Sequence, residues 1–214
     1  MGGQQRLPGK AVSIMVITIG RQFGSGGREI GRRLAEKLGF EYYDKELLTK
    51  VAQKNGYDEE LVTEYDEKPN SSLIYSLYAG TMAATNVVPI SQKLAAAQFD
   101  EIRSLAEQGV NCVVIGRCAD YVLKDHSECA HVFVYAPLEA RKTRVIETEN
   151  IPKEVVEKYI LRRDKNRQKY YEFYTGRDWG SMVNHDLCIN SAALGIDASV
   201  DVICDFVKKK LNIG

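Results

Sequence analysis

The sequence predicts an α/β fold in which a parallel β-sheet is flanked by helices. Short β-branched apolar runs alternate along the chain with segments whose apolar residues recur at helical spacing, and such alternation implies right-handed crossovers between parallel strands. A glycine-rich stretch directly follows the first apolar run. Of the 214 residues, 44% are hydrophobic, which is enough for one substantial core. We therefore expect a single domain over residues 14–214, preceded by a polar, glycine-rich and disordered leader at 1–13.

The first elements of this fold are a strand, a glycine loop and a helix. Residues 14–19 (IMVITI) form a short, continuous and β-branched run, as expected of a strand that is buried on both faces. After the glycines a helical pattern runs to Gly39, with apolar positions at Ile30, Leu34, Ala35 and Leu38. A short extended piece at 40–43 then leads to Asp44, and the pattern becomes helical again after it.

The rest of the chain predicts a helical insert followed by further strand and helix pairs. Residues 56–100 contain no strand pattern and are expected to form an insert with an apolar face, which makes a side lobe. The later strands are expected at 112–116, 131–135 and 186–189. The later helices are expected at 92–108, at 137–148, from Pro152 through a basic and aromatic run up to Trp179, and at 198–211.

The charges and cysteines of the chain limit its environment and its partners. It has 29 basic and 29 acidic residues, whereas proteins that bind nucleic acid usually carry an excess of positive charge. No apolar run reaches the roughly 18 residues of a membrane helix, and the N-terminus lacks the plan of a secretory signal. The five cysteines form no C-x-x-C pair, which is typical of reduced thiols. We expect a cytoplasmic protein that binds neither nucleic acid nor membranes.

The segment at 20–31 (GRQFGSGGREIG) joins a buried strand to a helix, which is the position of a phosphate-binding loop. Glycines allow backbone N–H groups to turn inward around an anion, and the following helix adds the positive end of its dipole. This pattern predicts a site for the phosphates of a nucleotide, formed by Gly24, Ser25, Gly26, Gly27, Arg28 and Glu29. The alternative is a tight strand-to-helix turn that needs glycines for its conformation alone.

The loop lacks the lysine of the usual pattern G-x-x-x-x-G-K-[ST]. If Gly26 is the final glycine, Gly27 takes the lysine position; if Gly27 is final, Arg28 takes it and Glu29 replaces the hydroxyl residue. Neither register supplies a lysine or a serine or threonine for magnesium. Arg28 is the expected substitute, because a guanidinium can donate two hydrogen bonds to phosphate oxygens.

The chain from about Met15 onward resembles the cytidylate kinase-like branch of the nucleoside monophosphate kinases. Four segments carry the resemblance in the same order: VITIGRQFGSGGREIGRRLAEKLG, VVIGRCADYVL, HVFVYAPLEARKTR and DLCINSAALGID. The resemblance implies a P-loop NTPase fold with a helical insert at about 56–100 and a mobile lid at about 162–180. It also implies an ATP-dependent phosphotransferase that uses Mg²⁺ and acts on a nucleoside monophosphate, most simply CMP or dCMP.

The resemblance also assigns site residues. Arg117 matches the arginine that holds the acceptor nucleotide, but Cys118 stands where the family has an acidic residue. Asp44 occupies the place of an aspartate near the acceptor. The segment LRRDKNRQKYYEFYTGR matches the lid, with Arg163 and Asp164 as its arginine and aspartate pair and Arg167 as a second lid arginine. The resemblance therefore implies the reaction and leaves the choice of base open.

Phosphoryl transfer requires that donor and acceptor are aligned, water is excluded and charge is neutralised. On this basis Arg28, Arg163 and Arg167 are the predicted catalytic residues, and Asp44, Arg117 and Asp164 are the predicted substrate-binding residues. Each has a structural alternative: a solvated basic helix for the lid arginines, and a helix N-cap for Asp44.

Two alternatives to the function stay open. One is a catalytically silent nucleotide sensor, and the other is a P-loop kinase for a different small acceptor. Arg141 and Arg144 are further candidates that either face the nucleotide or form surface ion pairs, and Asp120 is a candidate substitute for the missing acid. The three histidines show no metal-ligand spacing, so the sequence assigns neither a metal ligand nor an oligomeric state.

Overall fold

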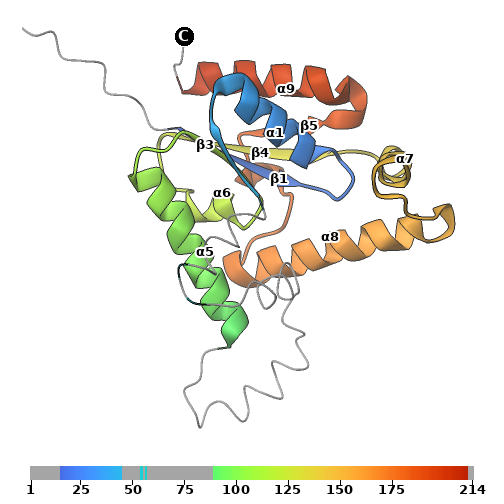
Figure 1. Ribbon diagram of the computed structural model, residues 1–214, viewed down its shortest axis with the longest axis horizontal. Helices are drawn as coiled ribbons and strands as arrows, with labels where there is room; N and C mark the ends of the chain where they lie inside the picture. Colours follow the sequence, from blue (N-terminus) through green and yellow to red (C-terminus); the bar gives the residue numbers. More distant parts are fainter. Residues whose placement is uncertain (1–14, 45–53, 55, 57–88, 212–214) are drawn as a thin grey trace, which may run out of the picture.

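A computed structural model describes residues 15–44, 54, 56 and 89–211 of the chain. Its centre is a parallel sheet of five strands in the order β2-β3-β1-β4-β5 (Figure 1). The strands are β1 (Val16–Arg21), β2 (Glu41–Tyr43), β3 (Cys112–Ile115), β4 (Cys129–Tyr135) and β5 (Leu187–Asn190). This confirms the predicted α/β fold with its parallel sheet.

Helices cover both faces of this sheet. On one face lie α1 (Gly27–Leu38) and α9 (Ser191–Lys210), and on the other lie α5 (Ile90–Glu107) and the short α6 (Ala119–Val122) (Figure 1). Between β4 and β5 the chain forms α7 (Leu138–Glu149), the long α8 (Lys153–Thr175) and a single 3₁₀ turn, η1 (Met182–Asn184). In Figure 1, α8 runs below the sheet from α7 toward α5.

Two apolar layers, one on each side of the central strand, cover the faces of the sheet. Ile17 and Ile19 face α1 and α9, where they pack with Leu34 and Ile203. Val16 belongs to the opposite layer with residues of α5 and α6. Because successive side chains of a strand point to opposite faces, a β1 with apolar residues on both faces is what a doubly covered sheet requires.

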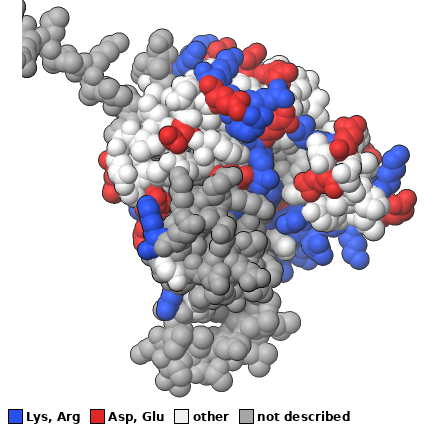
Figure 2. Space-filling view, in the orientation of Figure 1, with Lys and Arg blue, Asp and Glu red and all other residues white. Residues whose placement is uncertain are grey.

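The charged residues of the surface are interspersed. Over α1 and α9 in Figure 2, basic and acidic side chains alternate on the visible face. Arg33 there pairs with Asp197 at 2.5 Å, and Lys37 pairs with Asp201 at 2.5 Å. Within the described part of the chain, no helix has the length and apolarity needed to cross a membrane.

Several element boundaries differ from those that the sequence predicts. The C-terminal helix begins at Ser191 instead of 198, because the Asn190 side chain accepts a hydrogen bond from the Ala192 N–H at 3.1 Å and caps it; a kink at Gly195 follows. The helix after Pro152 ends at Thr175 before Trp179, because Gly176 adopts the left-handed conformation that terminates helices. The sequence did not predict α6. The leader and residues 57–88 of the insert lie outside the described residues.

Two buried cysteines provide a test of the core. Burial chiefly raises the pKa of the Cys112 and Cys129 thiols to about 12, so that at pH 8 roughly one in 10⁴ of each is the reactive thiolate. We expect iodoacetamide, followed by mass spectrometry, to label both far more slowly in the native protein than in urea. Cys188, which is only half-buried, is the internal comparison and should react first. Labelling of Cys112 at the rate of an unfolded thiol would contradict this packing.

Candidate functional site

The glycine loop connects β1 to α1 at the carboxyl edge of the sheet. Gly24 and Gly26 have φ angles of 76° and 80°, a left-handed conformation that costs other residues about 1–2 kcal/mol. A Cβ atom would also lie 2.8 Å from Val145 at Gly24 and 2.5 Å from Ile196 at Gly26. Both glycines are therefore required, and the loop leads into the N-terminus of α1, where helix N–H groups favour an anion.

Hydrogen bonds from three sides hold the loop in place. The buried Ser25 hydroxyl donates to the Gln22 carbonyl oxygen at 2.8 Å, so its side chain braces the loop from inside. The Ser191 hydroxyl donates to the Ser25 carbonyl oxygen at 2.6 Å. The Ala136 N–H donates to the Gln22 side-chain oxygen at 3.1 Å. Such bracing pre-organises a loop, which lowers the cost of binding a ligand.

The charged residues that follow the glycines form ion pairs in the structure. Arg28 contacts the Asp44 carboxylate at 2.5 Å through its Nε, and its side chain is 57% exposed. Glu29 pairs with Arg33 and Arg144. Partial burial opposes the ionisation of Glu29, but Arg144 and Arg33 outweigh it and lower its pKa. Two predicted site residues, Arg28 and Asp44, thus lie together, and their roles toward a nucleotide stay predictions.

The turn after β3 has an unusual backbone. Gly116, Arg117 and Cys118 have φ angles of 69°, 60° and 53°, so that three consecutive residues are left-handed. Two of them are not glycine, and such residues cost about 1–3 kcal/mol each and cluster at functional sites. The turn places Arg117 at the carboxyl edge of β3, where its side chain is almost fully buried.

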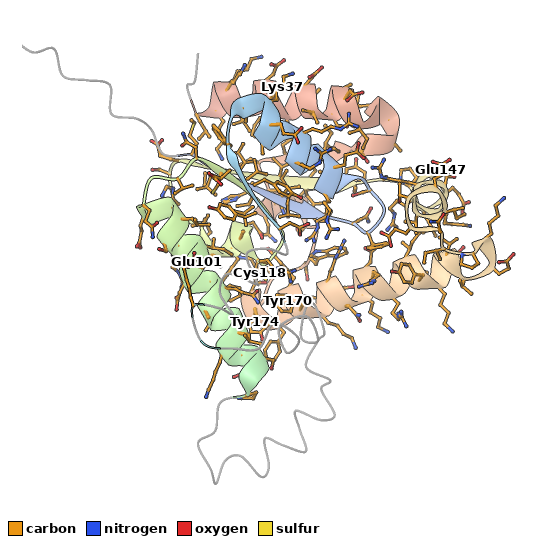
Figure 3. All side chains as sticks on the ribbon, in the orientation of Figure 1. Lys37, Glu101, Cys118, Glu147, Tyr170 and Tyr174 are labelled. Carbon is orange, nitrogen blue, oxygen red and sulfur yellow. The ribbon has the colours of Figure 1, made fainter. Side chains whose placement is uncertain are left out.

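A pocket opens at this edge, between the glycine loop, the turn after β3 and α8. Three arginines line it, Arg21, Arg117 and Arg167. Its aromatic wall is formed by Phe133, Tyr170, Tyr171 and Trp179. Figure 3 labels Cys118 and Tyr170, two of the lining residues, where α6 faces the C-terminal half of α8. Crevices at the carboxyl ends of parallel strands are the usual ligand sites of open α/β sheets, and this one is suited to an anion with an aromatic group.

The predicted lid arginines lie on α8 and face the loop. Both guanidinium groups lie over the Phe23 ring, Arg163 at 5.7 Å and Arg167 at 5.3 Å from its centroid. Arg163 donates to the Tyr159 hydroxyl at 3.0 Å. Arg167 donates to the Arg21 carbonyl oxygen at 3.3 Å and lines the pocket. Of the two, Arg167 is the one that the structure places beside Arg117.

Asp164 connects α8 to the loop and to α7. Its carboxylate accepts a hydrogen bond from the Phe23 N–H at 2.7 Å and from Arg141 Nη1 at 2.5 Å. The side chains of Arg141 and Asp164 are only 7% and 13% exposed, so Arg141 forms a buried pair instead of a surface one. Both oxygens of Asp164 are thus engaged within the protein, and its predicted contact with a substrate stays a prediction.

Sequence reasoning missed several residues of the pocket. Arg21 lies within the loop, but its position at a strand end gave no sign of where its side chain points. Asp120, which the sequence did offer as a candidate, lines the pocket, and its carboxylate accepts a hydrogen bond from the Tyr171 hydroxyl at 2.6 Å. Burial and the Asp120 charge raise the pKa of Tyr171. His185 also lines the pocket, with Nε2 at 3.9 Å from Asp120; no signal in the sequence separates it from a core histidine.

The described residues include no group of three or more His, Cys, Asp or Glu side chains that is arranged to hold a metal ion. Magnesium usually keeps several waters and binds through substrate phosphates with one or two carboxylates. Such a mode fits this loop, where the Asp44 carboxylate is buried near the start of α1.

Comparisons with known proteins agree with this geometry. The model of the cytidylate kinase-like family matches residues 16–193. A cytidylate kinase of Methanopyrus kandleri is 27% identical over 191 residues, covering 88% of this chain and 91% of the relative. A cytidylate kinase of Methanocaldococcus jannaschii is 24% identical over 192 residues, covering 88% and 95%.

Solved structures show the same fold. An uncharacterized protein from Eubacterium ventriosum superimposes with a TM-score of 0.70 at 27% identity, covering 91% of this chain and 98% of that one. A shikimate kinase from Bacteroides thetaiotaomicron superimposes with a TM-score of 0.54 at 14% identity, covering 91% and 98%, and shares the fold alone. Since the family match spans most of the chain, from the first strand through the last, the protein belongs to the cytidylate kinase-like family.

Proposed function

We propose that the protein is an ATP-dependent nucleotide kinase whose acceptor is a nucleoside monophosphate, with CMP and dCMP as the first candidates. The observation that carries this proposal is the pocket with three arginines directly beside the glycine loop. A kinase needs two adjacent phosphate sites with positive charge at the boundary between them. The relatives named cytidylate kinase support the same class of reaction.

Each part of the site has a role in this proposal. The loop from Gly24 to Gly27 and the N-terminus of α1 hold the donor phosphates, while Arg117 holds the acceptor phosphate. The aromatic wall, which includes Trp179 and Phe133, packs against the base, because a nucleobase is flat and offers a π-face. Arg167 contacts the phosphoryl group in transfer. Magnesium, when bound with ATP, neutralises the charge of the donor phosphates.

The cytoplasm is the compartment that this proposal implies. All five cysteines lie within the described residues and all are thiols, as in proteins of a reducing compartment. The partner is a small nucleotide, and the balance of 29 basic and 29 acidic residues gives the chain no net positive charge to attract nucleic acid.

A second candidate function is a nucleotide sensor without turnover. One observation favours it: Gly26 is the left-handed N-cap of α1, and Gly27, the residue that follows it, carries no cation. In the register with Gly26 as the final glycine, the lysine position is therefore Gly27, which offers no charge to a phosphate. Electrostatic stabilisation of the transferred group is usually the largest catalytic contribution. If no other residue replaced that cation, the protein would bind ATP and leave it intact.

Coupled ADP release distinguishes these functions. We expect turnover with ATP and Mg²⁺ on one member of a panel of nucleoside monophosphates that includes CMP, dCMP and UMP, with shikimate as a non-nucleotide acceptor. Arg32 is an exposed arginine of α1 that pairs with Glu36 and lies outside the proposed site. The variant Arg32→Ala should therefore turn over at the rate of the wild type. No turnover on any acceptor, with ATP binding intact by calorimetry, would refute the kinase and support the sensor.

A further inference from the structure

The glycine at position 27 has a steric cause. Gly27 opens α1 with a helical backbone, and its φ angle is not in the left-handed region, so the backbone itself would accept any side chain. A Cβ atom there would lie 2.6 Å from the Cβ and 3.2 Å from the Cγ of Arg21. Real Cβ atoms do not approach another side chain that closely. A lysine at 27 is therefore incompatible with the stem of Arg21.

The side chain of Arg21 crosses the position that a lysine stem would take and ends at the turn after β3. Its Nη1 lies 1.9 Å from where a Cβ atom of Gly116 would be, so the guanidinium rests on the bare backbone of that residue. Arg21 is buried and lines the pocket together with Arg117 and Arg167. Its charge thus lies between the glycine loop on one side and the acceptor pocket on the other.

Two backbone contacts fix where this side chain begins. Arg21 is the last residue of β1 and pairs in register with Val134 of β4. Its carbonyl oxygen accepts a hydrogen bond from Arg167 at 3.3 Å. The strand therefore sets the position of Arg21, and the hydrogen bond from α8 comes from Arg167, the arginine assigned to the transferred group.

We propose that Arg21 is the phosphate-binding cation of this loop, in place of the lysine that such loops carry at position 27. This inference rests on the proposed function and deepens it, because it says which residue makes the lysine-free loop competent for transfer. A guanidinium presents five N–H donors in a planar fork. From its position Arg21 can donate to a donor phosphate and to the acceptor phosphate at once, because its fork has donors on more than one side.

The swap of the two positions gives a direct test. Arg21→Gly should lower kcat about 100-fold, the order found when one donor to a transition-state charge is lost, and Gly27→Lys alone should also lose activity because the two side chains collide. The double variant Arg21→Gly/Gly27→Lys should regain at least about tenfold over Arg21→Gly, since the lysine then has both space and the usual role. Arg32→Ala is the matched control, and thermal melting confirms that each variant is folded.

The outcomes separate this inference from the proposed function. If the wild type turns over and folded Arg21→Gly keeps its rate within about threefold, Arg21 is not the cation and the kinase stands. If folded Arg21→Gly/Gly27→Lys is no better than Arg21→Gly, the two positions are not equivalent and the inference fails. If the wild type does not turn over, calorimetry with ATP decides: unchanged affinity in Arg21→Gly overturns the inference, and weakened affinity that the double variant restores supports it.

Discussion

Arg167→Ala is expected to lower kcat about 10³-fold, the lower end of the effect of an arginine that stabilises a transferring phosphoryl group. The KM for the acceptor should change much less. Arg167 lies at the boundary between loop and pocket, with its guanidinium over Phe23 and one N–H on the Arg21 carbonyl oxygen. An arginine at that place stabilises the charge that develops in the transition state more than it stabilises the bound substrate. Steady-state kinetics over both substrates measures the two parameters.

Two neighbours on α8 serve as controls for Arg167. Arg162 is exposed and lies over the Tyr159 ring at 6.0 Å, so Arg162→Ala should retain activity. Arg163 contacts Phe23 and the Tyr159 hydroxyl but does not line the pocket, so Arg163→Ala should lose less than Arg167→Ala. An equal loss in the Arg162 and Arg167 variants would mean that α8 contributes only its general positive charge.

Asp164→Ala is expected to lower the free energy of unfolding by about 3–5 kcal/mol, the cost of removing one partner of a buried ion pair. The change leaves the charge of Arg141 buried without its carboxylate, and it removes the acceptor of the Phe23 N–H. Urea unfolding followed by circular dichroism measures the loss. Because the contact joins α8 to the glycine loop, ATP affinity should fall in the same variant.

A double variant separates the charge from the packing. Replacing both partners, as in Arg141→Met/Asp164→Leu, should restore most of the lost stability, since buried ion pairs are often no more stable than apolar groups of similar volume. Asp100→Ala removes an exposed pair with Arg103 and should cost about 1 kcal/mol or less. If Asp164→Ala were as mild as Asp100→Ala, α8 would not be held to the loop through this carboxylate.

The sequence predicted the sheet well, because the pattern that marks each strand lies within a few consecutive residues. Apart from β2 (Glu41–Tyr43), the strands contain short apolar runs with a glycine, proline or polar boundary, and a strand buried on both faces needs little else. The start of α9 was missed, because the Asn190 cap and the kink at Gly195 depend on how the chain leaves β5. The insert received a helical prediction, but residues 57–88 lie outside what the structure describes.

The site was harder to predict, because strand register and the orientation of each helix decide which of its residues come together. In the sequence Arg28 is the cation next to the final glycines, yet the structure pairs it with Asp44. Arg21 reaches the pocket because the pairing of β1 with β4 turns its side chain over Gly27. Arg163 and Arg167 are one helical turn apart and look equivalent in the sequence. Only the packing of α8 on the loop distinguishes them.

The left-handed turn at 116–118 has a consequence for how this protein evolves. Glycine at positions 117 and 118 would relieve the backbone strain of Arg117 and Cys118, but it would also remove two side chains that are only 5% and 3% exposed. Strain and burial therefore oppose each other at this turn, and neither position changes to glycine without a loss of packing. A substitution at either residue alters the backbone and the wall of the pocket together, as expected where a site stores strain.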